Sequence, residues 1–139
     1  MCDNGDAAQH LVNTILFEAI GSLGADQALM PVFFDRLVTA CRSMQKLIPW
    51  IVSTAGSDIR SVHAGASAYL EMWGALLGGW MHYMQLRAAL RSNLPAETVA
   101  AVKCSAQFFA MDALAHVPAI AQLVRSGTTP CLEFSDSHW

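Results

Sequence analysis

The sequence predicts an all-α protein, an up-and-down four-helix bundle with proline-kinked helices. In four segments, apolar side chains recur every three or four residues, which is the period of an amphipathic helix. Glycines and prolines fall between these segments or near their ends, where helices start and stop. No segment reads as a convincing β-strand. These observations favour helix packed on helix as the whole architecture.

Length and composition predict one domain with an apolar surface. A chain of 139 residues fits a single core, and we expect residues 1–127 to form it. Residues 128–139 contain turn formers without helical period and are expected to form an extended or disordered tail. Because only 14% of residues are charged and 54% are hydrophobic, part of the apolar surface is expected in a subunit interface.

The first two helices are predicted from their end signals. Residues 7–23 form the first, and Gly24 ends it. The second has Pro31 in its early turns and continues toward Pro49. Because proline lacks a backbone donor and clashes with the preceding turn, we expect a kink near residues 45–46.

The last two helices follow in the same way. Gly56 ends the second helix, and Asp58 is a fresh N-cap for a third helix over residues 58–92. Pro95 opens the fourth helix. Pro118 is expected to bend or break that helix before it ends.

The chain is organised around residues 64–91, which carry the strongest pattern. Gly74 and Gly78 are four apart and therefore share a helix face that a neighbouring backbone can approach closely. A large apolar stripe, expected to be buried, flanks them: Leu70, Trp73, Leu77, Trp80, Tyr83 and Met84. The residues predicted to form a packing or subunit interface are Tyr69, Trp73, Gly74, Leu77, Gly78 and Trp80.

Several partner classes are disfavoured. A net charge of −3 without a basic cluster argues against nucleic acid. The charge-free run from Met72 to Leu86 is shorter than the roughly 20 residues of a transmembrane helix, so no membrane span is expected. The first ten residues lack Lys and Arg, which argues against a secretory signal and favours the cytoplasm.

Cofactor and metal motifs are not apparent. The four cysteines are scattered without a CxxC pair, which favours reduced thiols over a zinc or redox site. No Glu-x-x-His pair indicates a two-metal bundle. Haem held by His82 or His116 with a methionine is a disfavoured alternative, because Met at helical spacing usually fills a core.

The candidate acid/base residues are His82, Asp112 and His116. Asp112 and His116 are four apart on one helix face, which suits a metal, an acid/base couple or a hydrogen bond on the helix surface, and the hydrogen bond is favoured. His82 is interpreted as a buried histidine with one satisfied partner. An aromatic set is a candidate lining for a hydrophobic ligand cavity, although a plain core is favoured: Trp73, Trp80, Tyr83, Phe108 and Phe109.

Two stretches carry a family resemblance. YLEMWGALLGGWMHYMQLRAAL, residues 69–90, and VKCSAQFFAMDALAHVPAIAQLVRSG, residues 102–127, resemble the carboxy-terminal helical extension of one acyl-CoA dehydrogenase subgroup. The matching positions are Tyr69, Leu70, Gly74, Gly78, Gly79 and Trp80, then Ala106, Phe108, Phe109 and Pro118. The resemblance extends over residues 37–127 and rests on packing residues.

The resemblance implies a packing role and no flavin chemistry. The family enzymes also have a helical amino-terminal domain, a sheet domain over the flavin and a bundle that supplies the carboxylate base, and this sequence matches none of those parts. It looks like the extension alone, free-standing or excised. The expected partner is a second copy or a flavoprotein subunit. The alternative is a hydrophobic small-molecule binder or a cofactor-independent enzyme.

Overall fold

The structure is a computed structural model that describes residues 4–21 and 28–126. Helices account for nearly all of this part of the chain, and it contains no strand, so the all-α prediction is confirmed. The elements are α1 (Asp6–Gly21), α3 (Pro31–Ala55), α4 (Ile59–Ala64), α5 (Ala66–Leu90), α6 (Ala96–Phe109), the π-helical turn η1 (Ala110–Leu114) and α7 (Ala115–Ser126).

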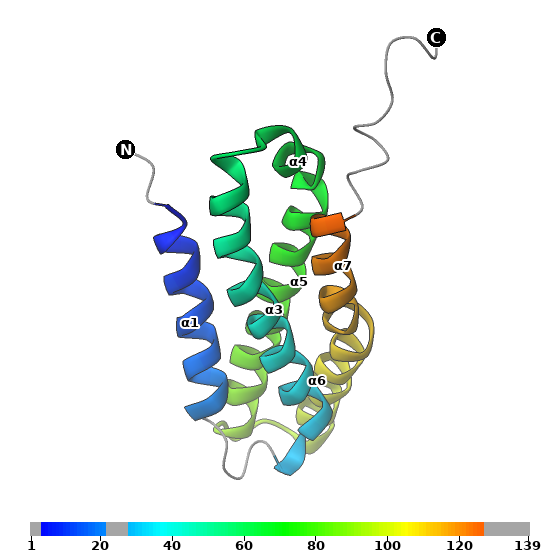
Figure 1. The fold of residues 1–139 in the computed structure, drawn as a ribbon. Helices are drawn as coiled ribbons and strands as arrows, with labels where there is room; N and C mark the ends of the chain where they lie inside the picture. Colours follow the sequence, from blue (N-terminus) through cyan, green and yellow to red (C-terminus); the bar gives the residue numbers. More distant parts are fainter. Residues whose placement is uncertain (1–3, 22–27, 127–139) are drawn as a thin grey trace, which may run out of the picture.

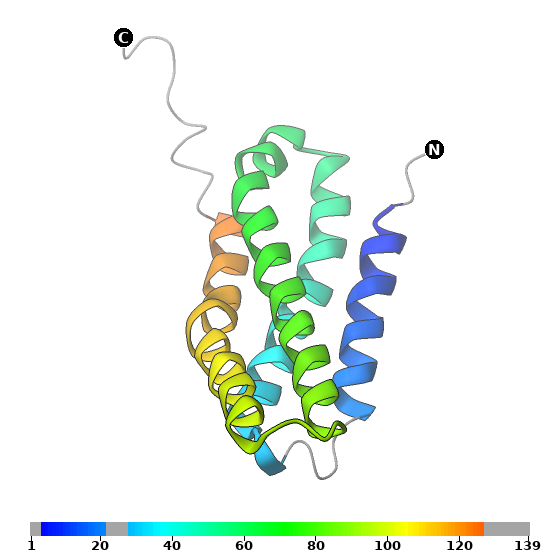
Figure 2. The same ribbon diagram turned by 180° about the vertical axis from the view of Figure 1, so that it is seen from behind.

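The long helices lie side by side along one direction (Figure 1). Helix α1 descends from the amino terminus, α3 rises, α5 descends, and α6, η1 and α7 rise again as one run. Helix α1 packs on α3, and α5 packs on α6 and α7. Seen from behind, α5 lies in front, with α1 on one side and α6 on the other (Figure 2).

The core is built on aromatic and branched side chains from the facing sides of these helices. The ring of Phe34 packs edge-to-face on Phe33 at 5.5 Å and on Tyr83 at 6.0 Å between centroids, the geometry that aromatic quadrupoles prefer. The Tyr83 hydroxyl donates to the backbone oxygen of Glu18 at 3.2 Å. The largest fully buried side chains are Tyr83, Phe33, Phe34, Ile15, Leu37, Met44, Leu47, Met72, Leu76, Leu86, Leu114 and Val12.

The third predicted helix is divided in two at Gly65. Asp58 is the N-cap, as predicted, and its carboxylate accepts from the Ser61 backbone N–H at 3.2 Å, but α4 ends at Ala64. A Cβ atom on Gly65 would lie 3.1 Å from Cγ1 and 3.2 Å from the carbonyl oxygen of Val124 in α7. The close approach of α7 therefore leaves little room for a Cβ atom at this junction.

Neither internal proline ends a helix. Pro49 lies inside α3, and Pro118 lies inside α7, so the break considered at Pro118 is wrong. The hydrogen-bond pattern changes earlier, in η1, which ends at Leu114. Proline at 118 cannot donate to the carbonyl four residues before it, that of Leu114, and a widened turn is a common way to accommodate such a loss.

The apolar stripe predicted on the central helix is only partly buried. Tyr83 is in the core, whereas Leu70, Leu77 and Met84 are exposed. The face that α5 buries consists of Met72, Ala75, Leu76, Gly79, Tyr83, Leu86 and Ala89. The stripe is not fully buried because α5 has neighbouring helices on three sides and, among the described residues, none on its outer side.

Some expectations fall outside the described residues, namely the stop at Gly24 and the tail at residues 128–139. Within the described part, the helical run Ala96–Ser126 is long and apolar enough to cross a membrane by length and composition alone. That property is weak support for a span, because single helices of soluble proteins share it.

Candidate functional site

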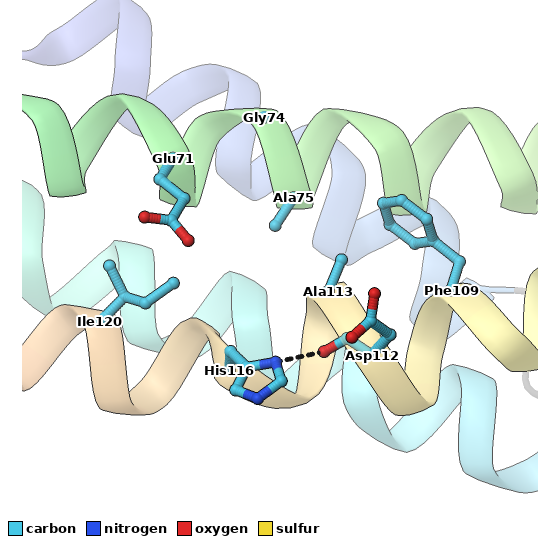
Figure 3. A pocket seen from close by; sticks show the side chains of 8 residues that line it. All are labelled: Glu71, Gly74, Ala75, Phe109, Asp112, Ala113, His116 and Ile120. Atoms are coloured by element: carbon cyan, nitrogen blue, oxygen red, sulfur yellow. Dashed lines mark hydrogen bonds between the residues drawn. The ribbon is translucent and has the colours of Figure 1, made fainter.

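A groove of about 460 Å³ lies between α5 and the opposite run of α6, η1 and α7. Figure 3 shows the Glu71 carboxylate entering it from α5, with Phe109 toward one end and Ile120 toward the other. Its lining residues are Glu71, Gly74, Ala75, Phe109, Asp112, Ala113, His116 and Ile120. The volume is in the range of small-molecule sites.

The π-turn sets one wall of this groove. Asp112 and Ala113 lie within η1 and His116 follows in α7, so the extra residue per turn affects how the wall faces α5. The predicted pairing of Asp112 with His116 takes the form of a side-chain to backbone contact: His116 Nδ1 is 2.6 Å from the Asp112 carbonyl oxygen (Figure 3). Because a carbonyl only accepts, Nδ1 must carry the proton, which leaves Nε2 as the free nitrogen of the neutral ring.

The groove therefore combines two carboxylates with one imidazole. Glu71, Asp112 and His116 are all exposed, so water reaches their polar atoms. Such a set can exchange protons with a bound molecule, and its two negative charges disfavour anionic ligands. Among residues 4–21 and 28–126 no three His, Cys, Asp or Glu side chains are grouped to hold a metal ion.

The glycines of α5 serve different roles. A Cβ atom on Gly78 would lie 2.5 Å from Cζ of Phe109, and one on Gly79 would lie 2.9 Å from Cδ2 of Leu114. These two glycines receive side chains from α6 and η1. A Cβ atom on Gly74 would meet nothing within 4 Å, so Gly74 is an open notch at the groove.

His82 does not reach this groove. Its ring is tilted against the ring of Phe109, with 4.7 Å between centroids. Its Nδ1 atom is buried and has no hydrogen-bond partner. The hydrogen-bond partner expected for His82 is therefore missing at Nδ1.

The predicted aromatic and packing residues are distributed around α5. Of the five aromatic candidates only Phe109 lines the groove; Tyr83 is 1% exposed in the core and Phe108 is 71% exposed. Tyr69 packs edge-to-face on Trp73, with 6.2 Å between centroids. Trp80 Nε1 donates to Glu18 Oε2 at 3.0 Å and so joins α5 to α1.

Sequence reasoning missed Glu71 as a site residue. Glu71 and Arg87 are the only charged residues in α5. A single carboxylate in an otherwise apolar helix could have identified Glu71 as a candidate site residue. It also missed Met81, which extends the exposed apolar surface of α5.

Comparison with known proteins agrees with this helical architecture. A family model described as "Acetyl-CoA dehydrogenase C-terminal like" matches residues 11–135. No curated protein and no solved structure gives a significant match. Because the matched region spans most of the sequence, the chain belongs to the acetyl-CoA dehydrogenase C-terminal-like family of helical domains.

Proposed function

We propose that this protein is a helical association module that joins a second copy of itself or a flavoprotein subunit through the outer face of α5. The observation that carries the proposal is the exposure of large apolar side chains there: Leu70 is 68%, Met81 56%, Met84 42% and Leu77 36% exposed. Contiguous exposed apolar surface on a soluble domain is typical of an interaction site.

The scaffold supports this function. In the proposed arrangement, an up-and-down four-helix bundle with proline kinks holds α5 rigid from three sides. The glycine contacts to Phe109 and Leu114 fix α5 against α6 and η1. The family relationship favours a packing role, because the resemblance implies that the extension of such enzymes packs beside a helical core.

Sedimentation equilibrium tests the proposal. The chain is measured alone at up to 100 µM, and mixed with a purified FAD-containing acyl-CoA dehydrogenase-like subunit from the same organism. Met84→Glu is compared with Val32→Glu, because both side chains are 42% exposed but Val32 lies on α3. We expect a dimer or a mixed complex that Met84→Glu weakens and Val32→Glu preserves. A monomer in both settings, or equal effects of the two variants, rejects the proposal.

A second candidate function rests on the groove. Glu71, Asp112 and His116 line about 460 Å³ of space next to the apolar walls of Phe109 and Ile120, which suits the neutral acyl or aromatic part of a small molecule. Ligand-observed NMR with N-octylacetamide, a neutral acyl amide, tests it. Binding weakened by Ile120→Asp and unchanged by Val32→Asp supports the candidate, and no binding at millimolar probe rejects it.

A further inference from the structure

The outer face of α5 carries a heptad pattern. We define the α5 seam as six positions in alternating steps of four and three residues: Leu70, Gly74, Leu77, Met81, Met84 and Ala88. All six are exposed. Steps of four and three correspond to the a and d positions of a coiled coil, which pack against another helix of matching pattern. The seam spans 18 steps, or roughly 27 Å at 1.5 Å per residue.

We propose that the occupant of this seam is the α5 helix of a second copy, antiparallel and centred between Leu77 and Met81. This inference rests on the proposed association function and specifies its partner and register. In this register each chain places Leu70 opposite Ala88, Gly74 opposite Met84, and Leu77 opposite Met81 of the other. A two-fold axis relates the copies, so the interface is closed.

Size complementarity selects the antiparallel orientation. We call each pair of opposed seam residues a layer. In the antiparallel register every layer contains a large side chain, and the two smallest seam residues, Gly74 and Ala88, each face a large one. A parallel pair would place Gly74 on Gly74 and Ala88 on Ala88, and it would leave two layers without large side chains. Unfilled layers of that kind lose dispersion contacts and cost stability.

The distribution of charge along α5 favours the same orientation. The end of the seam near Leu70 carries the exposed carboxylate of Glu71, and the other end carries Arg87 and the exposed Arg91. Antiparallel pairing brings the acidic end of one copy level with the basic end of the other, which is favourable at the scale of the helix ends. Glu71 points into the groove and lies on the flank of the seam opposite to Arg87, so these two side chains form no direct ion pair across the seam. The opposed helix dipoles add to this preference.

The inferred pairing also affects the groove. Gly74 lines it and has open space at the position of a Cβ atom. Met84 of the second copy would occupy the layer of Gly74 and add an apolar wall beside Glu71. The groove of each chain would then be bounded in part by the other chain.

Disulfide trapping tests the register. Cys2, Cys104 and Cys131 are replaced by Ser, and the buried Cys41 is kept. Leu70→Cys and Ala88→Cys are introduced in separate chains that differ in mass. The antiparallel seam predicts cross-links only after mixing, between the two different variants, because equivalent positions lie roughly 27 Å apart. Both sites are exposed, so the variants are expected to keep the wild-type circular dichroism.

Other outcomes overturn the inference in distinguishable ways. Homodimeric cross-links of Leu70→Cys alone indicate a parallel pair. A dimer without either cross-link indicates another face. A chain that is monomeric alone yet binds the flavoprotein subunit rejects the second copy and retains the association function, whereas a chain that does neither rejects both.

A layer exchange provides an independent test. Gly74→Met places two methionines in one layer and is expected to weaken the dimer about tenfold, equivalent to about 1.4 kcal/mol. Adding Met84→Ala restores one large side chain to that layer and is expected to recover most of the affinity. Equal affinity of Gly74→Met and wild type, or no recovery in the double variant, contradicts the register.

Discussion

The ring of Phe109 lies directly on the backbone of Gly78, where a Cβ atom would stand 2.5 Å from Cζ of the ring. The same ring contacts the tilted ring of His82 and lines the groove. Phe109 thus links the packing of α5 and α6 to the geometry of the candidate site.

Replacing three glycines of α5 by alanine, one at a time, is expected to change the free energy of unfolding by three different amounts. Gly74→Ala is expected to stabilise the fold by about 1 kcal/mol, because it gains helix propensity and meets no atom. Gly78→Ala is expected to lower the free energy of unfolding by about 1 kcal/mol net, because the Phe109 ring must shift. Gly79→Ala is expected to lower the free energy of unfolding by about 2 kcal/mol, because the core side chains of Leu114 and Leu37 enclose the added methyl group.

Urea unfolding measures the order of these three stabilities. Each variant also carries Leu77→Glu, which is expected to prevent association through the outer face of α5, so that only the single chain contributes. A loss of stability for Gly74→Ala would show that its notch is filled within the single chain.

His82→Phe should raise the free energy of unfolding by about 1 kcal/mol. The change removes the buried, unpaired Nδ1 and keeps a ring against Phe109. Thermal unfolding of His82→Phe and of His63→Phe, an exposed control on α4, checks the difference. A destabilised His82→Phe would reveal a polar partner for that nitrogen.

Glu18→Ala should cost about 1–2 kcal/mol, because the Trp80 indole N–H loses its acceptor in a partly buried position. Glu18→Gln keeps a side-chain oxygen and should cost less. Chemical denaturation followed by circular dichroism compares the two, and equal losses would assign the effect to other contacts of Glu18.

Burial raises the pKa of the Cys41 thiol from 9.0 to about 12. Because the folded pKa is the higher one, stability is full below pH 9 and falls as the pH rises from 9 toward 12. The free energy of unfolding of Cys41→Ala should therefore fall less between pH 9 and pH 12 than that of the wild type. Denaturation curves between pH 8 and pH 11 compare the two proteins, and parallel curves would contradict the burial of the thiol.

Hydrogen bonds from the Ser61 side chain and backbone lower the pKa of Asp58 below 3.8. A lowered folded pKa means that the stabilisation of α4 is present above 3.8 and is lost as the pH falls through the folded value. Asp58→Ala should therefore differ from wild type at neutral pH and converge with it in acid. Amide exchange at Ser61 measures this, with Asp58→Asn as a capping control.

Local signals in the sequence predicted most of the helices. The place of Pro31 in the first turn of α3 and the N-cap at Asp58 follow from backbone chemistry within a few residues. The division at Gly65 was not predicted, and the residue that packs closely on Gly65, Val124, is remote in sequence. The π-turn before Pro118 likewise depends on how α7 is held against its neighbours.

The candidate site was only half predictable. The sequence named Asp112 and His116 as candidates because a separation of four residues places them on one helix face, and both line the groove. Glu71 joins them only through the packing of α5 beside η1 and α7, whereas His82 contacts the Phe109 ring and does not line the groove.

The sequence by itself determined that the chain is helical, where most helices start, and that residues 64–91 are rich in apolar and small side chains, because these properties depend on neighbours within a turn or two. The tertiary structure alone decided which side of α5 is covered. Gly78 and Gly79 face α6 and η1, whereas Leu70, Leu77 and Met84 face outward. The physical reason is that a helix apolar on several sides has no preferred inner face until its neighbours are in place.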